Sequence, residues 1–299
     1  MINGIINVYK EAGFTSHDVV AKLRGILKMK KIGHTGTLDP DATGVLPVCL
    51  GKGTKVCDLL TDKDKTYEAV LLLGTTTDTQ DTSGTVLSTK EVTVNKQQIE
   101  EAILSFVGEY DQVPPMYSAL KVGGKKLYEL AREGKEVERK ARRITIHQIE
   151  IEEIAMETKE VRFSVNCSKG TYIRTLCYDI GELLGCGGCM KQLKRTKVSQ
   201  FDITDSLTLD QIETLRDEGT LLEHIIPVDA MFDSYAKVVI KEEFCRFIYN
   251  GNSFVDAHIS SCDREIITNK VRVYDSKNEF VGIYQEVGKG LYKPVKMFL

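Results

Sequence analysis

Segments with strand periodicity and segments with helical periodicity interleave irregularly along this chain. Residues 160–167 alternate apolar and polar side chains as a half-buried strand does, and 67–73 and 144–151 are further strand candidates. Helices are predicted over 96–107, behind a capping-box pattern, and over 175–184, before a glycine. This irregular order favours an α+β fold over a regular βαβ winding.

The segment KKIGHTGTLDPDATGVLPVCLGKGTK, residues 30–55, crowds glycines and prolines around Asp39. It follows a predicted helix over 17–29 with Ser16 as its N-cap. Because it lacks a clear helical or strand period, we expect 33–53 to be a loop.

From the residues alone, three interpretations of this segment stay open. A phosphate-binding loop is disfavoured because the glycine spacing of nucleotide-binding motifs is absent. His34, Asp39 and Asp41 could bind a metal ion, but such residues are ordinary in loops. The simplest interpretation is a turn, since Asp-Pro is a common turn signal.

Length and composition indicate a globular protein with one large or two modest domains. The chain has 299 residues, of which 42% are hydrophobic and 28% charged. The start, MINGIINVYKEAG, has no basic flank, and no apolar run approaches the roughly 20 residues of a spanning helix. We therefore expect no signal peptide, no membrane contact and a cytoplasmic location. Past 227 short β-rich runs with turn residues dominate, so we predict domains at 1–230 and 235–299.

Eight cysteines are present, and only Cys186 and Cys189 form a CxxC pair. A structural zinc site usually needs four ligands, but no second pair exists and the histidines are scattered. We expect free thiols and no metal, with a redox pair as the alternative.

The charge is unevenly distributed. A net charge of −3 argues weakly against nucleic-acid binding. However, Lys and Arg cluster at 22–31, 121–143 and 191–197, which is typical either of solvated faces or of a phosphate-binding surface. The candidate phosphate contacts are Lys125, Lys126, Lys194 and Arg195.

Several motifs together resemble one protein family. GHTGTLDPDATGVLPVCLGKGTK resembles the catalytic motif of the TruB family of tRNA pseudouridine synthases, of the bacterial type. Further segments resemble later parts of that family in the same order: DKTYEAVLLLG, TDTQDTSG, VPPMYSALKVGGKKLYELAREGKEV, CSKGTYIRTLCYDIGELLGCG and QLKRTKVSQF. The resemblance spans about residues 3 to 201, and the C-terminal stretch more faintly resembles a PUA-type RNA-binding barrel.

The resemblance implies a fold and a reaction. The fold is the pseudouridine synthase fold, an α+β architecture with a central mixed, mainly antiparallel sheet flanked by helices and loops, plus a small C-terminal PUA-like β-barrel. The reaction isomerises uridine 55 in the T-loop of tRNA: the C1′–N1 bond breaks, the base turns over, and C1′ joins C5. It needs an aspartate, matched by Asp39, and no metal or cofactor. The base must leave its stack, so glycines that let the backbone approach RNA fit the motif.

Two further catalytic residues are implied by the resemblance. Tyr67 stacks on the flipped base, and its hydroxyl is a candidate acceptor for the C5 proton. Arg174 pairs with Asp39 and keeps the carboxylate ionised. Without the resemblance, Tyr67 would be a core aromatic and Arg174 a surface charge.

The resemblance also implies substrate-binding residues. Tyr172 and Leu193 line the uridine pocket, His34 contacts RNA where the base is displaced, and Lys10 lies near the site. Glu11 replaces the proline usual after this lysine, so the local turn is in question.

Residues 116–143 fit an RNA-gripping insertion. Tyr117 and Tyr128 lie among lysines, so aromatic rings can stack on bases while ammonium groups meet phosphates. A solvated helix is the alternative.

The implied partner is the T-arm of tRNA, with no obligatory protein partner and a monomeric enzyme. The alternatives are a guide-RNA-dependent synthase or one acting on another RNA, and, from a different class, a tRNA-binding folding chaperone. Intact Asp39, Tyr67 and Arg174 disfavour the chaperone. A hydrolase is more distant still, because no water-activating base accompanies Asp39.

Overall fold

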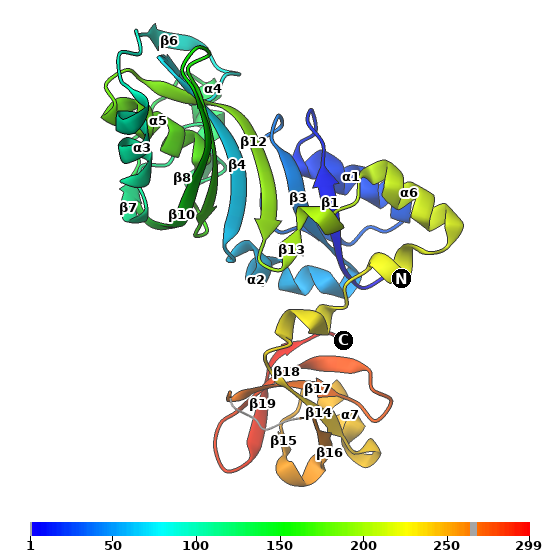
Figure 1. Cartoon of the computed structure of the whole chain (residues 1–299). Helices are drawn as coiled ribbons and strands as arrows, with labels where there is room; N and C mark the ends of the chain where they lie inside the picture. Colours follow the sequence, from blue (N-terminus) through cyan, green and yellow to red (C-terminus); the bar gives the residue numbers. More distant parts are fainter. Residues whose placement is uncertain (1, 264–267) are drawn as a thin grey trace.

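The computed structural model describes residues 2–263 and 268–299, which form a large sheet with helices on it and a small sheet near the C-terminus (Figure 1). The large, nine-stranded sheet contains β1 (Gly4–Lys10), β2 (Ile32–His34), β3 (Thr43–Leu50), β4 (Lys65–Leu73), β7 (Gly108–Gln112), β10 (Arg142–Ala155), β11 (Glu160–Cys167), β12 (Gly188–Val198) and β13 (Phe201–Asp202). The two separate hairpins are β5 (Thr75–Thr77) with β6 (Val86–Thr89), and β8 (Lys121–Val122) with β9 (Lys125–Lys126).

The α-helices are α1 (Ser16–Leu27), α2 (Cys57–Thr61), α3 (Lys96–Leu104), α4 (Leu127–Arg132), α5 (Ile173–Leu183), α6 (Leu209–Glu218) and α7 (Cys245–Tyr249). The 3-10 helices are η1 (Gly51–Val56), η2 (Ile203–Asp205), η3 (Leu221–His224), η4 (Val228–Phe232), η5 (Glu242–Phe244) and η6 (Asp256–His258).

The large sheet has the order β1-β3-β12-β4-β11-β10-β7, with β2 and β13 beside β3 and β12. Its pairs are antiparallel except β3 with β12, where Gly44 lies opposite Arg195. The strands approach so closely here that a Cβ on Gly44 would lie 2.1 Å from the Arg195 carbonyl oxygen, and the backbone has φ +105°. The predicted mixed, mainly antiparallel sheet is confirmed.

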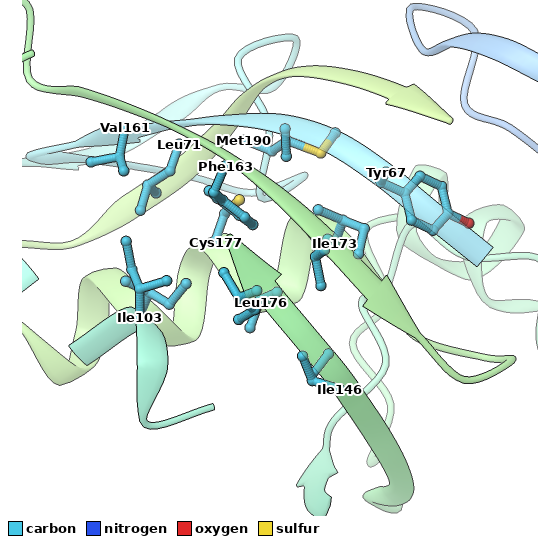
Figure 2. Close-up of a cluster of buried hydrophobic side chains, with 14 of the residues drawn as sticks. Tyr67, Leu71, Ile103, Ile146, Val161, Phe163, Ile173, Leu176, Cys177 and Met190 are labelled. Carbon is cyan, nitrogen blue, oxygen red and sulfur yellow. The ribbon is translucent and has the colours of Figure 1, made fainter. Parts of the chain in front are cut away.

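Two groups of helices cover the two halves of this sheet (Figure 1). α3 and α5 pack on β4, β10 and β11 through one buried cluster that includes Ile103, Phe163 and Leu176 (Figure 2). α1 and α6 pack on β1, β2 and β3 through a second cluster that includes Leu23 and Ile212. Strands β4 and β12 lie between the two halves.

Some local predictions need correction. The stretch 33–53 is not one loop, because most of it forms β2, β3 and η1; its apolar run is buried between β1 and β12. Thr15, not Ser16, caps α1, since its side chain accepts from the Asp18 amide. The capping box predicted for the helix after Asn95 is confirmed, although this helix ends at Leu104.

The six-stranded C-terminal sheet has a barrel-like form, with the order β15-β19-β18-β17-β14-β16. Its strands are β14 (Ala236–Ile240), β15 (Phe254–Val255), β16 (Ile259–Cys262), β17 (Lys270–Tyr274), β18 (Phe280–Glu286) and β19 (Leu291–Met297). This sheet is docked on the large one, because Phe232, Ile283 and Phe298 share a buried cluster with Val45 and Phe201.

Within the described residues no helix is both long and apolar enough to cross a membrane. Cys186 and Cys189 are buried free cysteines, as predicted.

Candidate active site

The loop between β2 and β3 carries Asp39 to the mouth of a cleft of about 1140 Å³. Two buried groups hold this loop. The Leu38 amide donates a 2.9 Å hydrogen bond to the Ser16 hydroxyl, and the Lys10 ammonium donates one of 2.9 Å to the Pro40 carbonyl. These bonds fix the backbone on both sides of the aspartate, so its carboxylate is preorganised.

Lys10 is not placed to bind substrate. It is fully buried, and besides Pro40 its ammonium donates to the carbonyls of Glu11 (3.0 Å) and Phe14 (2.6 Å). Since an ammonium has three protons, its hydrogen-bonding capacity is used within the protein. Burial lowers the pKa of Lys10 to about 8, which nearby Asp39 opposes. The role predicted for Lys10 is therefore corrected from substrate contact to support of the loop that carries Asp39.

Arg195 is likewise not a phosphate contact, because only 1% of it is exposed. Its Nε donates to the Val45 carbonyl (2.7 Å) and its Nη2 to the Gly36 carbonyl (3.3 Å). The guanidinium thus bonds the backbone on both sides of Asp39 and holds the loop that carries it.

Asp39 and Arg174 form a two-point ion pair. The Arg174 Nε lies 3.0 Å from Asp39 Oδ2, and Nη2 donates to Oδ1 at 3.2 Å. The same guanidinium donates to the carbonyls of Thr79 (3.0 Å) and Tyr117 (2.8 Å), and it lies 3.7 Å from Asp81. The guanidinium is therefore fixed on several sides, and its fork geometry orients the carboxylate.

The electrostatics of Asp39 combine opposing effects. Burial raises the pKa of its carboxyl above the ordinary value, Arg174 opposes this rise, and Asp81 adds to it. The ion pair is thus what favours the carboxylate in a partly dehydrated site.

Tyr67 lies on β4 in the floor of the cleft, 7% exposed. Figure 2 shows it at one end of the buried cluster, with its hydroxyl pointing away from the apolar side chains. Burial raises the pKa of its hydroxyl, and Arg195, directly opposite on β12, opposes that rise. The ring can offer a stacking face while the hydroxyl lies among charged groups.

Tyr172 and Leu193 also line the cleft, so the structure brings both together with Asp39, Tyr67 and Arg174. The backbone of Tyr172 is held on both sides by the buried Gln112 side chain, which accepts from its amide at 2.8 Å and donates to its carbonyl at 3.0 Å.

Two histidines lie near the site: His34, which was predicted to contact RNA, and His17, for which no role was predicted. His34 packs edge-on against His17, with ring centroids 5.2 Å apart, and its Nδ1 accepts from the Gly36 amide. Of the two, only His17 is among the described residues that line the cleft. Burial lowers the pKa of His34, and His17 adds to this. His17 is thus better placed than His34 to meet a ligand.

The remaining basic candidates are accessible but paired. Lys125 bonds Glu133 at 3.0 Å, Lys126 donates to a tyrosine hydroxyl, and Lys194 lies 2.6 Å from Glu68. Exposed pairs of this kind are weak, so an incoming phosphate can compete for these lysines.

Sequence reasoning missed three residues that support the site: Ser16, Asp81 and Gln112. Asp81 belongs to the TDTQDTSG run, which was noticed without any role being assigned to its carboxylate. Ser16 was predicted only as a helix cap, and Gln112 gave no signal, because each supports the site by bonding a backbone group brought close only by folding.

Among residues 2–263 and 268–299, no three His, Cys, Asp or Glu side chains gather as a metal site would require.

Solved structures share this architecture. One chain in the structure of an H/ACA RNP bound to a substrate RNA containing 2′-deoxyuridine superposes with a TM-score of 0.72 and 26% identity, over 99% of this chain and 85% of that one. A chain of a Cbf5-Nop10-Gar1 complex gives 0.71 and 28%, with the same coverage. The mixed sheet, the barrel-like C-terminal sheet and the cleft with its paired aspartate are those of a pseudouridine synthase.

Residues 24–173 match the family model described as "TruB family pseudouridylate synthase (N terminal domain)", and residues 174–233 match "tRNA pseudouridylate synthase B C-terminal domain". The tRNA pseudouridine synthase B of Lachnoclostridium phytofermentans is 58% identical, and that of Clostridium kluyveri 48%, with all of both chains covered. This chain belongs to the TruB family of pseudouridine synthases.

Proposed function

We propose that this enzyme isomerises uridine 55 in the T-loop of tRNA, with Asp39 as the catalytic group. The observation that carries the proposal is the two-point ion pair between Asp39 and the buried Arg174 at a cleft that also contains Tyr67. The names of the relatives, tRNA pseudouridine synthase B, support tRNA as the substrate.

We assign the steps of the reaction to residues that line the cleft. A uridine extruded from the T-loop stacks on Tyr67 between Tyr172 and Leu193. Asp39, oriented by Arg174, starts the cleavage of the C1′–N1 bond. After the base has turned and C5 has joined C1′, the Tyr67 hydroxyl removes the C5 proton. Bound RNA covers the cleft and excludes water from it. Without water, the interactions between charged groups in the cleft become stronger.

RNA binding is assigned to the accessible basic groups and to the C-terminal sheet. Lys125, Lys126 and Lys194 meet phosphates, and 116–143 grips the T-arm. We propose 1–230 as the catalytic domain and 235–299 as a PUA-like RNA-binding domain. The enzyme works in the cytoplasm as a monomer, without an obligatory protein partner, metal or cofactor.

One assay tests the assignment: tritium release from 5-tritiated uridine in a T-arm stem-loop RNA, without cofactor. The wild-type enzyme should release tritium, and Asp39→Asn should lower the single-turnover rate at least about a thousandfold while RNA binding persists. Asp41→Asn, two residues away in the same loop, is the matched control and should stay within about tenfold.

The outcomes separate the alternatives. Activity of Asp39→Asn within tenfold of wild type would remove Asp39 from the chemistry. Release only from a different RNA, or only with an added guide RNA, would refute the T-loop assignment. RNA annealing without any tritium release would favour the chaperone.

A further inference from the structure

Arg195 lies directly opposite Tyr67 on the neighbouring antiparallel strand. It is one of the largest fully buried side chains of the protein, although the neighbouring Lys194 is half-exposed. Its position therefore places a permanent positive charge beside the tyrosine hydroxyl, out of contact with bulk water.

The charge on Arg195 has no nearby counter-ion. Among the described residues, no carboxylate lies within the 4.0 Å of an ion pair with Arg195, and its guanidinium donates to the neutral carbonyls of Val45 and Gly36. A second cation lies close by: Lys65 and Arg195 both adjoin Gly36, and a Cβ on this glycine would lie 3.8 Å from Lys65 Cε and from Arg195 Nη1. Lys65 is also buried, and its ammonium bonds backbone carbonyls.

Support of the loop that carries Asp39 does not require two buried cations close together. A buried charge is costly unless it is paired, and two like charges side by side add to that cost. Burial, together with the charge of Arg195, lowers the pKa of Lys65 to about 8. A site of this kind stabilises an anion that forms next to it, and the group that adjoins Arg195 is the Tyr67 hydroxyl.

The groups around Tyr67 support this reading. Arg195 faces it from β12, Cys167 from β11 and Asp39 from the catalytic loop. Cys167 and Asp39 both raise the pKa of the phenol, as burial does, so Arg195 is the group among these that stabilises the phenolate.

We propose that Arg195 is a positioning residue for the second half of the reaction: it stabilises the Tyr67 phenolate that removes the C5 proton. This rests on the proposed function, in which Tyr67 is the base. Tyr67 gives its proton to solvent before RNA closes the cleft. The C5–H bond then breaks and its proton goes to the phenolate; its electron pair forms the C5=C6 double bond, the N1=C6 electrons move to N1, and N1 takes a proton from solvent when the cleft reopens.

The test separates proton removal from the earlier steps. Arg195→Gln and Arg195→Lys are compared with wild type under single-turnover conditions on T-arm RNA that carries either uridine or 5-fluorouridine. In 5-fluorouridine a fluorine replaces the C5 proton. The enzyme can still move C1′ from N1 to C5 in this nucleotide, but the proton removal that we assign to Tyr67 and Arg195 does not take place. Arg216→Lys, a change to an arginine that also bonds a backbone carbonyl (Ile26, 2.7 Å) outside the cleft, is the matched control.

We expect Arg195→Gln to slow pseudouridine formation from uridine about 10- to 100-fold more than it slows transfer of 5-fluorouridine, since loss of the bonds to the Asp39 loop slows both reactions but loss of the charge slows only proton removal. The ratio of the rates with uridine and with 5-deuterated uridine should be larger for Arg195→Gln than for the wild-type enzyme. Arg195→Lys, which keeps the charge, should recover part of the rate.

Equal slowing on both RNAs, with an unchanged isotope effect, would show that Arg195 only clamps the loop and would overturn the proposal. Unchanged rates on both would overturn it as well. If Arg195→Gln does not fold, Arg195→Lys carries the same comparison of the two RNAs. Absence of pseudouridine formation by wild type would instead refute the proposed function.

Discussion

Replacing Arg174 by lysine keeps a positive charge in the site but removes the guanidinium fork. Arg174 holds Asp39 at two points, 3.0 and 3.2 Å, and is itself held by the carbonyls of Thr79 and Tyr117. A single ammonium nitrogen cannot hold both carboxylate oxygens in the fork geometry and reach both carbonyls.

The expected loss follows from these bonds. Hydrogen bonds to charged groups contribute about 1.5–3 kcal/mol each, so two lost bonds amount to about 3–6 kcal/mol. The net loss of stabilisation is smaller than this sum, because the lysine ammonium still attracts the Asp39 carboxylate. If about 3–4 kcal/mol of transition-state stabilisation is lost, the rate falls about 10²- to 10³-fold.

The pH dependence separates orientation from charge. In the proposed reaction Asp39 acts as a carboxylate, a form that is present above its pKa and lost as the pH falls through it. Burial already raises that pKa and Arg174 opposes the rise. Arg174→Gln should therefore move the acid limb of the rate profile to higher pH, whereas Arg174→Lys should lower the rate at every pH with little displacement.

Single-turnover tritium release at saturating enzyme, measured across the acid range, checks both expectations, with Arg216→Lys as the control. A lysine variant within threefold of wild type would refute the argument that the fork orients Asp39. An acid limb that does not move in Arg174→Gln would refute the argument from charge.

Three further predictions follow from the same structure. Tyr67→Phe keeps the ring and loses the hydroxyl, so pseudouridine formation should fall about 10²- to 10⁴-fold while binding persists; near-normal rates would confine Tyr67 to stacking. Reversing the charges of Lys125 and Lys126 together should weaken T-arm binding and flatten its salt dependence without changing saturated single-turnover rates; affinity that does not depend on salt would contradict the phosphate contacts. Removing residues 235–299 should uncover Phe232 and its buried cluster and so lower solubility, measured by light scattering; a soluble truncation with unaltered tRNA affinity would exclude an RNA-binding role for this part.

Local sequence signals determined much of the secondary structure. The capping box at Asn95 specifies where its helix begins, because the bonds involve residues three apart in the chain. The alternation in 160–167 likewise specifies β11, and the resemblance of the motifs identified the segments that bring Asp39, Tyr67 and Arg174 to one cleft.

Burial of charged residues was decided by the tertiary structure. Lys194 and Arg195 are adjacent in one basic run, but successive side chains of a strand point to opposite faces of the sheet, so Lys194 is accessible on one face while Arg195 is enclosed on the other. Lys10 is buried for a similar reason, since the loop with Pro40 folds over the end of β1. Whether a cation is free for RNA or supports the loop that carries Asp39 depends on the backbone segments packed around it, and that information is spread over contacts between residues far apart in the chain.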